Sequence, residues 1–207
     1  MNKYLLIRCA VYSILLLISS CATVSKTSTT STQTTATAPA LSWQQREQKL
    51  TQIAQWQIDG KIAIRTAKDA GSLYVKWNEN HRHYTILLTG PLGSPSLQLV
   101  GQPNLVVLKT NDGKHFTAKN STALLMQQTG WNLPIENLYY WIRGLPVPGQ
   151  AYHGQYDNQN RLTTLSQAGW QIQFLHYTNA ANVELPDKLA LSGPNAYARI
   201  AVSQWGI

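Results

Sequence analysis

Residues 56–65 read Trp-Gln-Ile-Asp-Gly-Lys-Ile-Ala-Ile-Arg, with an apolar side chain or glycine at every second position. Trp56, Ile58, Ile62 and Ile64 therefore share one face of an extended segment, because successive side chains of a strand point to opposite faces. Antiparallel sheets commonly bury one face and leave the other in water, whereas parallel sheets are buried on both. The stretch predicts a half-buried strand of an antiparallel sheet.

The same alternation recurs along most of the chain, and the runs are separated by turn residues. Asp112-Gly113 tolerates the positive φ of a hairpin turn. Further strands are expected at 73–77, 84–88, 97–99, 105–108, 114–118, 152–157, 161–166, 170–177, 187–192 and 197–205. The chain is thus predicted to contain about eleven strands.

Three segments have helical patterns: 42–55, 123–128 and 135–142. Ser121 can cap the second helix, and Pro134 suits the position at which the third begins. An antiparallel sheet of this length, with so few helices, is expected to curl until the helices close its open side. The expected fold is mainly β with helices (α+β), an antiparallel half-open β-barrel of about eleven strands with a helical lid and an apolar cavity.

The N-terminal segment has the features of a secretory signal. Lys3 and Arg8 precede an apolar run at 9–18 that is too short to span a bilayer. Ile18-Ser19-Ser20-Cys21 looks like a bacterial lipobox, in which the cysteine is lipidated and becomes the new N-terminus. The alternative is that Cys21 is a plain thiol behind an ordinary cleavage site. We expect a signal peptide at 1–20 and lipidation at Cys21.

Cleavage before Cys21 would remove two positive charges and lower the formal net charge from +8 to +6. It would also remove Cys9, so the mature chain would hold one cysteine and no internal disulfide. Residues 22–40 are mostly Ser, Thr, Ala and Gln and cannot bury enough surface to fold, which predicts a flexible tether. Residues 41–207 then form one domain. Ala22 follows the cysteine, and the absence of an aspartate there favours the outer membrane.

Two blocks in the folded part carry a family resemblance. They are Leu87-Leu88-Thr89-Gly90-Pro91-Leu92-Gly93-Ser94 and Tyr140-Trp141-Ile142-Arg143-Gly144-Leu145-Pro146. Together with the lipobox, the polar tether and the W-Q-x-x-G-like strand entry at 56–60, they resemble the LolB family of lipoprotein localisation receptors. The resemblance covers essentially the whole chain.

The resemblance implies a half-open barrel of eleven strands whose apolar cavity takes the acyl chains of lipoproteins. It also implies a LolA-like periplasmic carrier as partner and a position at the periplasmic face of the outer membrane. The cargo would pass into that membrane without nucleotide hydrolysis. Pro91, Leu92 and Gly93 match the protruding loop of the family that helps place the cargo in the membrane. Gly90 departs from the asparagine expected there.

Seven tryptophans accompany only two phenylalanines, and several fall on inward strand positions. They can line a lipid cavity, or they can simply fill a core. The residues expected to line the cavity are Trp43, Trp56, Ile62, Ile64, Trp77, Ile86, Leu88, Leu99, Leu138, Trp141, Ile142, Trp170 and Ile172.

Other functional classes have less support. A lipid hydrolase would need a G-x-S-x-G elbow or a nucleophile–base pair, and the sequence has no such motif. It also has no phosphate-binding glycine motif, so neither an enzyme nor a cofactor is expected. His81 and His83 lack companions for a metal site, and the dispersed basic residues do not favour nucleic acid. A passive lipid-binding or envelope-structural lipoprotein of the same fold remains the alternative to a receptor, and the protein is expected to be a monomer.

Overall fold

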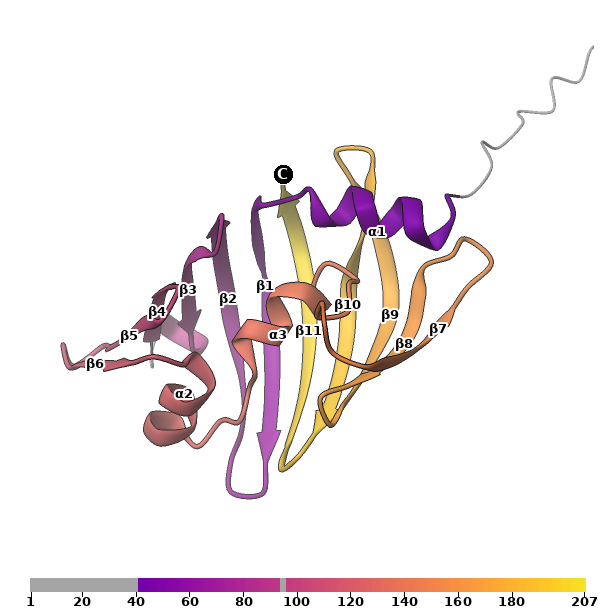
Figure 1. Cartoon of the computed structure of the whole chain (residues 1–207). Helices are drawn as coiled ribbons and strands as arrows, with labels where there is room; N and C mark the ends of the chain where they lie inside the picture. The colour runs from indigo at the N-terminus through magenta and orange to yellow at the C-terminus, as the bar shows by residue number, and fades with distance from the viewer. Residues whose placement is uncertain (1–40, 94–95) are drawn as a thin grey trace, which may run out of the picture. The chain divides into compact units, whose positions relative to one another are not determined.

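The computed structural model describes residues 41–93 and 96–207, in which eleven antiparallel strands form one sheet (Figure 1). The strands are β1 (Gln55–Thr66), β2 (Ala70–Asn80), β3 (His83–Thr89), β4 (Ser96–Gln102), β5 (Leu105–Thr110), β6 (His115–Ala118), β7 (Tyr152–Tyr156), β8 (Leu162–Gln167), β9 (Trp170–Ala180), β10 (Val183–Gly193) and β11 (Ala196–Gly206). The predicted signal peptide, Cys21 and the tether lie outside the described residues.

The sheet order places the first strand at its centre. Across the sheet the strands run β6-β5-β4-β3-β2-β1-β11-β10-β9-β8-β7, so β1 pairs with both β2 and the last strand, β11. Within the described part of the chain the edge strands β6 and β7 are not paired with each other. The predicted antiparallel, incompletely closed sheet of eleven strands is confirmed.

Inward-facing side chains form rows across the strands, because the register places apolar residues opposite one another. One row runs from Ile58 through Trp77, Ile86 and Leu99 to Leu108. Each of these side chains is at most 2% exposed. A slip of one residue would turn a strand's apolar set to solvent, so the apolar pattern specifies the register.

A β-bulge interrupts the pairing of the central strand with β11, with Ser203 of β11 as the extra residue. The pairing of β1 with β11 shifts between Asp59 and Gly60, which brings the two backbones close together. A Cβ atom at Gly60 would lie 2.3 Å from the carbonyl oxygen of Ala201. Glycine is required here because a side chain would overlap the neighbouring backbone.

Three helices complete the described domain: α1 (Trp43–Thr51), α2 (Ser121–Thr129) and α3 (Ile135–Trp141). In Figure 1 α1 lies near the ends of β9 and β10, α2 lies by β5 and β6, and α3 crosses the middle of the sheet. None of these helices is long and apolar enough to cross a bilayer.

The helix boundaries differ from the sequence expectations in two places. The first helix ends at Thr51 rather than at residue 55, because β1 already begins at Gln55. The N-cap of α2 is Asn120, whose side chain accepts a hydrogen bond from the Ala123 amide at 2.8 Å. Ser121 does not cap the helix because its hydroxyl is bonded to Glu136 of α3.

Gly60→Ala is expected to lower the free energy of unfolding by more than about 2 kcal/mol, because the backbone of β11 must move away. Gly71→Ala on β2 is the matched control, since a Cβ there meets nothing within 4 Å. Denaturant unfolding followed by circular dichroism measures both. Equal stability of the two variants would contradict the role given to the bulge.

Candidate functional site

The candidate site is the apolar interior between the sheet and the helices α2 and α3. Strands β1 to β4 and β11 supply one wall, and α2, α3 and the segment between them supply the other. The lining residues are Ile58, Ile62, Val75, Trp77, Ile86, Leu88, Leu99, Leu125, Leu133, Ile135, Leu138, Ile142 and Ile200. Every one of these side chains is apolar, so the interior suits hydrocarbon.

The interior is nearly full in this conformation. The hollow has a volume of about 30 Å³, whereas pockets for drug-sized ligands span about 300–1,000 Å³. Leu125 and Leu138 of the two helices are buried against the sheet. The helices therefore occupy the space that a long acyl chain would need.

The structure places seven of the residues predicted to line the cavity around this hollow: Ile62, Trp77, Ile86, Leu88, Leu99, Leu138 and Ile142. Ile64, Trp141, Trp170 and Ile172 are buried in the same core but not at the hollow. The region over β8 is filled by Trp141, whose indole donates a hydrogen bond to Gln167 at 3.0 Å and whose ring centre lies 6.2 Å from that of Trp170.

The two remaining tryptophans belong to other contacts. Trp56 packs against Trp77, with 5.0 Å between ring centres, and against Trp205 at 5.6 Å. Trp43 of α1 is only partly buried, and its ring packs at a tilt against Tyr156, with 4.9 Å between ring centres. Strand phase identifies inward tryptophans but does not say which part of the inner face a helix fills.

Six residues that line the hollow were not among those predicted from the sequence: Ile58, Val75, Leu125, Leu133, Ile135 and Ile200. The three on strands, Ile58, Val75 and Ile200, share the period-two phase of their neighbours, and that signal was available. Leu125, Leu133 and Ile135 belong to α2, α3 and their connection. Their inward position depends on how the helices pack.

Arg143 fastens the end of α3 to the end of α1. Its side chain is 1% exposed, and Nη1 donates hydrogen bonds to the carbonyl oxygens of Leu50 and Ile53 at 3.2 and 2.7 Å. Its guanidinium also lies 4.2 Å from the ring centre of Tyr139. Burial lowers the pKa of Arg143. The cation adds a second donor to the Leu50 carbonyl, which already accepts from the Ile53 amide, and it binds the Ile53 carbonyl just after the helix.

Two further polar side chains hold the helices in place. Gln167 is 3% exposed, and besides the Trp141 indole its Oε1 accepts from the Val147 amide at 2.8 Å. Glu136 of α3 accepts from the amide and hydroxyl of Ser121 at 2.8 and 2.6 Å. This carboxylate lies at the positive N-terminal end of α2, so α2 and α3 are joined as one unit.

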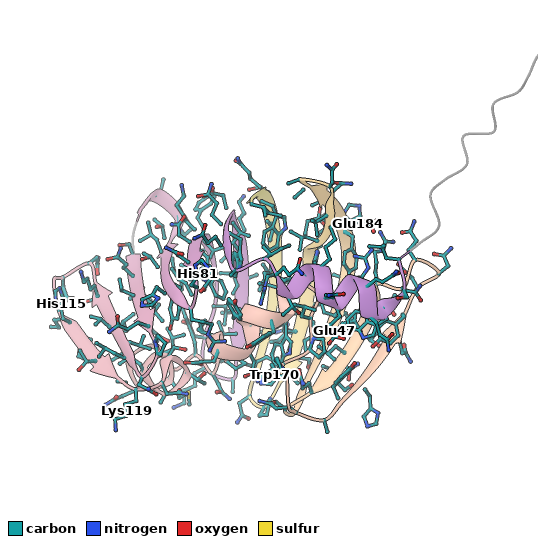
Figure 2. The ribbon with its side chains drawn as sticks, turned by 45° about the horizontal axis from the view of Figure 1, so that its top comes forward. Glu47, His81, His115, Lys119, Trp170 and Glu184 are labelled. Carbon is teal, nitrogen blue, oxygen red and sulfur yellow. The ribbon has the colours of Figure 1, made fainter. Side chains whose placement is uncertain are left out.

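The opening helix is attached separately. Glu184 of β10, labelled in Figure 2, forms ion pairs with Arg46 of α1 and with Arg161, the latter at 2.9 Å. Leu50 of α1 packs with Leu145 and Leu185 in a small second core. The connection after α3 is thus held between α1 and the sheet.

The turn between β2 and β3 meets the surface of α3. Arg82 donates a hydrogen bond to the Tyr140 hydroxyl at 3.0 Å, and its guanidinium lies 4.9 Å from the Tyr139 ring centre. Its amide donates to Oε1 of Glu79 at 2.7 Å. Burial raises the pKa of Glu79 to about 6, although the Arg82 amide and the neighbouring Trp77 indole act to lower it.

The loop after β3 presents an exposed leucine. Pro91–Gly93 forms a short turn in which Leu92 has φ of 61° and is fully exposed. A positive φ costs a residue other than glycine roughly 1–2 kcal/mol. Ser94 and Pro95 lie outside the described residues.

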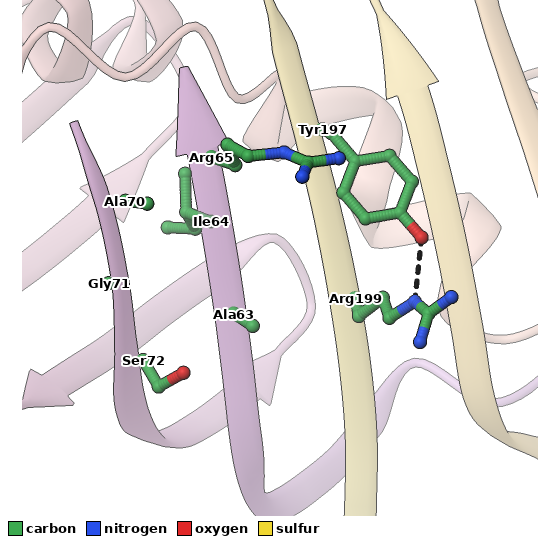
Figure 3. A pocket seen from close by; sticks show the side chains of 8 residues that line it. All are labelled: Ala63, Ile64, Arg65, Ala70, Gly71, Ser72, Tyr197 and Arg199. Carbon is green, nitrogen blue, oxygen red and sulfur yellow. Dashed lines mark hydrogen bonds between the residues drawn. The ribbon is translucent and has the colours of Figure 1, made fainter. Parts of the chain in front are cut away.

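The outer face of the sheet carries small and charged side chains where the interior carries apolar ones. A hollow of about 600 Å³ lies over β1, β2 and β11 (Figure 3). There the Arg199 Nε donates to the Tyr197 hydroxyl at 2.6 Å, and the Arg65 guanidinium lies 5.3 Å from the Tyr197 ring centre. Its small and charged lining does not suit hydrocarbon. Lys61 and Lys76, like Arg65, are exposed, as their outward phase predicts.

The two histidines considered for metal binding lie at the turn between β2 and β3. His81 has a φ of 50° in the turn, and His83 begins β3. In the described ranges no group of three or more His, Cys, Asp or Glu side chains is arranged to hold a metal ion.

A family model described as "Outer membrane lipoprotein LolB" matches residues 54–205, which include the strands and helices around the apolar interior. The chain belongs to the LolB family. Its LolB relatives include the outer-membrane lipoprotein LolB of Pseudomonas syringae, 35% identical over 94% of this chain and 93% of that protein. The LolB of Coxiella burnetii is 38% identical over 79% of this chain and 78% of its own length.

Solved structures show the same fold at low identity. A LolA superfamily protein from Nitrosomonas europaea has a TM-score of 0.55 and 8% identity, over 81% of this chain and 94% of that one. An outer membrane lipoprotein-sorting protein domain from Vibrio parahaemolyticus has a TM-score of 0.51 and 7% identity, over 78% and 90%. This chain thus shares its fold with these two proteins.

Glu79→Gln is expected to change how stability depends on pH. The folded chain binds the Glu79 proton more tightly than the unfolded chain, because the pKa rises from 4.5 to about 6 on folding. This carboxyl therefore lowers the free energy of unfolding as pH rises from about 4.5 to 6, by about 1–2 kcal/mol once solvent screening is allowed for.

Urea unfolding at pH 4 and pH 7 measures this difference. The Gln variant should be stabilised relative to the unaltered protein at pH 7 and not at pH 4. A gain of the same size at both pH values would show that the charge of Glu79 is not the cause.

Proposed function

We propose that the protein is an outer-membrane receptor that accepts acylated lipoproteins from a LolA-like periplasmic carrier and inserts them into the membrane. Membership of the LolB family gives the chain a role in outer-membrane lipoprotein localisation. The receptor step is supported by the interior, since all thirteen residues around its hollow are apolar. In this proposal the protein acts as a monomer, without enzymatic activity or nucleotide hydrolysis, and is anchored through lipid on Cys21.

The small hollow sets a condition on this function. An acyl chain can enter only if the joined helices α2 and α3 move away from the sheet. A sixteen-carbon chain gains roughly 12 kcal/mol on leaving water, at about 0.8 kcal/mol for each methylene. Entry also separates apolar surfaces that are already in contact, so the net affinity is much smaller. A receptor that has to release its cargo to a bilayer needs such a moderate affinity.

Leu92 fits the release step. Its side chain is fully exposed and its backbone is held at a positive φ, and such unfavourable backbone conformations cluster at functional sites. Burying one leucine in a bilayer contributes about 1.5–3 kcal/mol. That energy orients the domain at the membrane but does not anchor it, so the anchor has to be the lipid on Cys21.

Tryptophan fluorescence tests entry of acyl chains into the interior. Adding a triacylated cysteinyl peptide should change the emission, because Trp77 lines the hollow. Trp77→Phe should remove most of this response. Trp170→Phe is the matched control and should keep it, since Trp170 is buried away from the hollow. An equal loss in both variants would argue against this interior as the acyl site.

Handover of a labelled lipoprotein from a LolA-like carrier to the protein and then to liposomes tests the receptor itself. Leu92→Glu is expected to fold and to accept cargo, but to deliver it to liposomes at least about tenfold more slowly, because a charge opposes insertion. Leu175→Glu makes the same change at an exposed leucine on β9 and should deliver normally. Acceptance without delivery by the unaltered protein would instead support a passive lipid-binding lipoprotein.

A further inference from the structure

Beside the apolar interior lies a second hollow with a different lining. It has a volume of about 250 Å³ and opens between the β2–β3 end of the sheet and the helix α3. Trp77 and Ile135 line both hollows, so the two are neighbours across these side chains. A ligand with hydrocarbon in the interior would place its polar end in the second hollow.

Three polar groups converge on this hollow. Trp77 and Glu79 are two residues apart on β2 and point to the same face, and Tyr84 of β3 is the register partner of Glu79. Glu79 is 4% exposed, and the ring centres of Trp77 and Tyr84 are 6.3 Å apart. The register of β2 with β3 therefore builds the cluster.

The groups have hydrogen-bonding capacity that the described residues do not use. The Trp77 indole nitrogen, the Glu79 Oε2 and the Tyr84 hydroxyl are all buried without a hydrogen-bond partner there. The Trp77 indole lies beside the Glu79 carboxyl but not in hydrogen-bonding geometry. The Ser121 hydroxyl near Tyr84 donates its proton to Glu136 instead. Buried polar groups without partners are costly, and such groups in a folded protein call for an explanation.

We infer that this hollow is a polar subsite for the carbonyl and amide groups that link acyl chains to the N-terminal cysteine of a cargo lipoprotein. Indole N–H and phenol O–H donate to carbonyl oxygens, and a carboxylate accepts from an amide N–H. An N-acylated, S-diacylglyceryl cysteine offers ester and amide carbonyls together with one amide N–H, directly next to its chains. The inference rests on the proposed receptor function and adds recognition of the linkage.

The charges around the hollow favour a neutral ligand group. Glu79 and Glu136 contribute two carboxylates, and Arg82 and Lys119 contribute two cations. Glu136 is already occupied by Ser121 and Thr122, and the Arg82 guanidinium by the Tyr140 hydroxyl and the Tyr139 ring. No net charge is left to attract an ion. A dipolar ester or amide matches this setting better than a phosphate or a metal.

Tyr84→Phe tests the subsite with two probes of equal chain length. One is a peptide whose N-terminal cysteine carries three palmitoyl chains. The other is hexadecyl octa(ethylene glycol) ether below its micelle concentration, which has a sixteen-carbon chain but no carbonyl. Loss of the hydroxyl should weaken binding of the lipopeptide about three- to tenfold, as expected for one hydrogen bond. Binding of the ether should not change.

Tyr74→Phe is the matched control, because this tyrosine is exposed on the outer face of β2, and it should alter neither affinity. Thermal unfolding checks the fold of Tyr84→Phe, which should be at least as stable as the unaltered protein because no hydrogen bond is lost. An unchanged lipopeptide affinity, or an equal loss for both probes, would overturn the subsite while leaving the receptor function intact. Failure of the unaltered protein to bind either probe would refute the receptor function instead.

Discussion

The structure depends on keeping water away from the inner face of an incompletely closed sheet. The rows of apolar side chains that cross the sheet, such as the one that runs over five strands from Ile58 to Leu108, are buried. The described edges β6 and β7 are not paired with each other, so pairing of strands does not shield this face. Packing of α2 and α3 shields it, since each square ångström of apolar surface removed from water contributes roughly 25 cal/mol. A cover that is not part of the sheet can move without breaking the sheet.

The cover is held at a few polar points. Arg143 joins α3 to the end of α1, Gln167 joins the segment after α3 to β8, and Glu136 joins α3 to α2. All three residues hold α3 or the segments next to it. The helix α2 is held by the hydrogen bonds of Glu136 and by the packing of its own buried leucines. The contacts thus divide the cover into a fixed end near Arg143 and an end over β5 and β6 that is held mainly by apolar packing. Apolar packing is non-directional, so an acyl chain can replace it, as the proposed receptor function requires.

Much of the fold follows from local rules that act on the sequence. The period of two located the strands, because one face of each strand is buried and the other is in water, and turn residues such as Asp112-Gly113 separated them. The same pattern predicted that the side chains of Ile62, Trp77, Ile86 and Leu99 face inward. The positions of Leu125, Leu133 and Ile135 at the hollow could not be predicted, because they depend on where α2 and α3 lie over the inner face. The same reason applies to the six predicted residues that lie away from the hollow. The bulge beside Gly60 was not predicted, although a glycine within a strand can mark one. It arises where β11, about 140 residues further along the chain, approaches β1.

The sequence by itself determined the antiparallel strands, their buried faces and the family motifs around Leu92 and Arg143, because these depend on the residue types within short stretches. Only the tertiary structure decided that the interior is nearly filled, that Trp141 and Trp170 pack away from the hollow, and that Trp77, Glu79 and Tyr84 leave buried polar atoms side by side. The physical reason is that volume and hydrogen-bond partners are shared between residues distant in sequence. They are defined only after the strands have paired and the helices have packed across them.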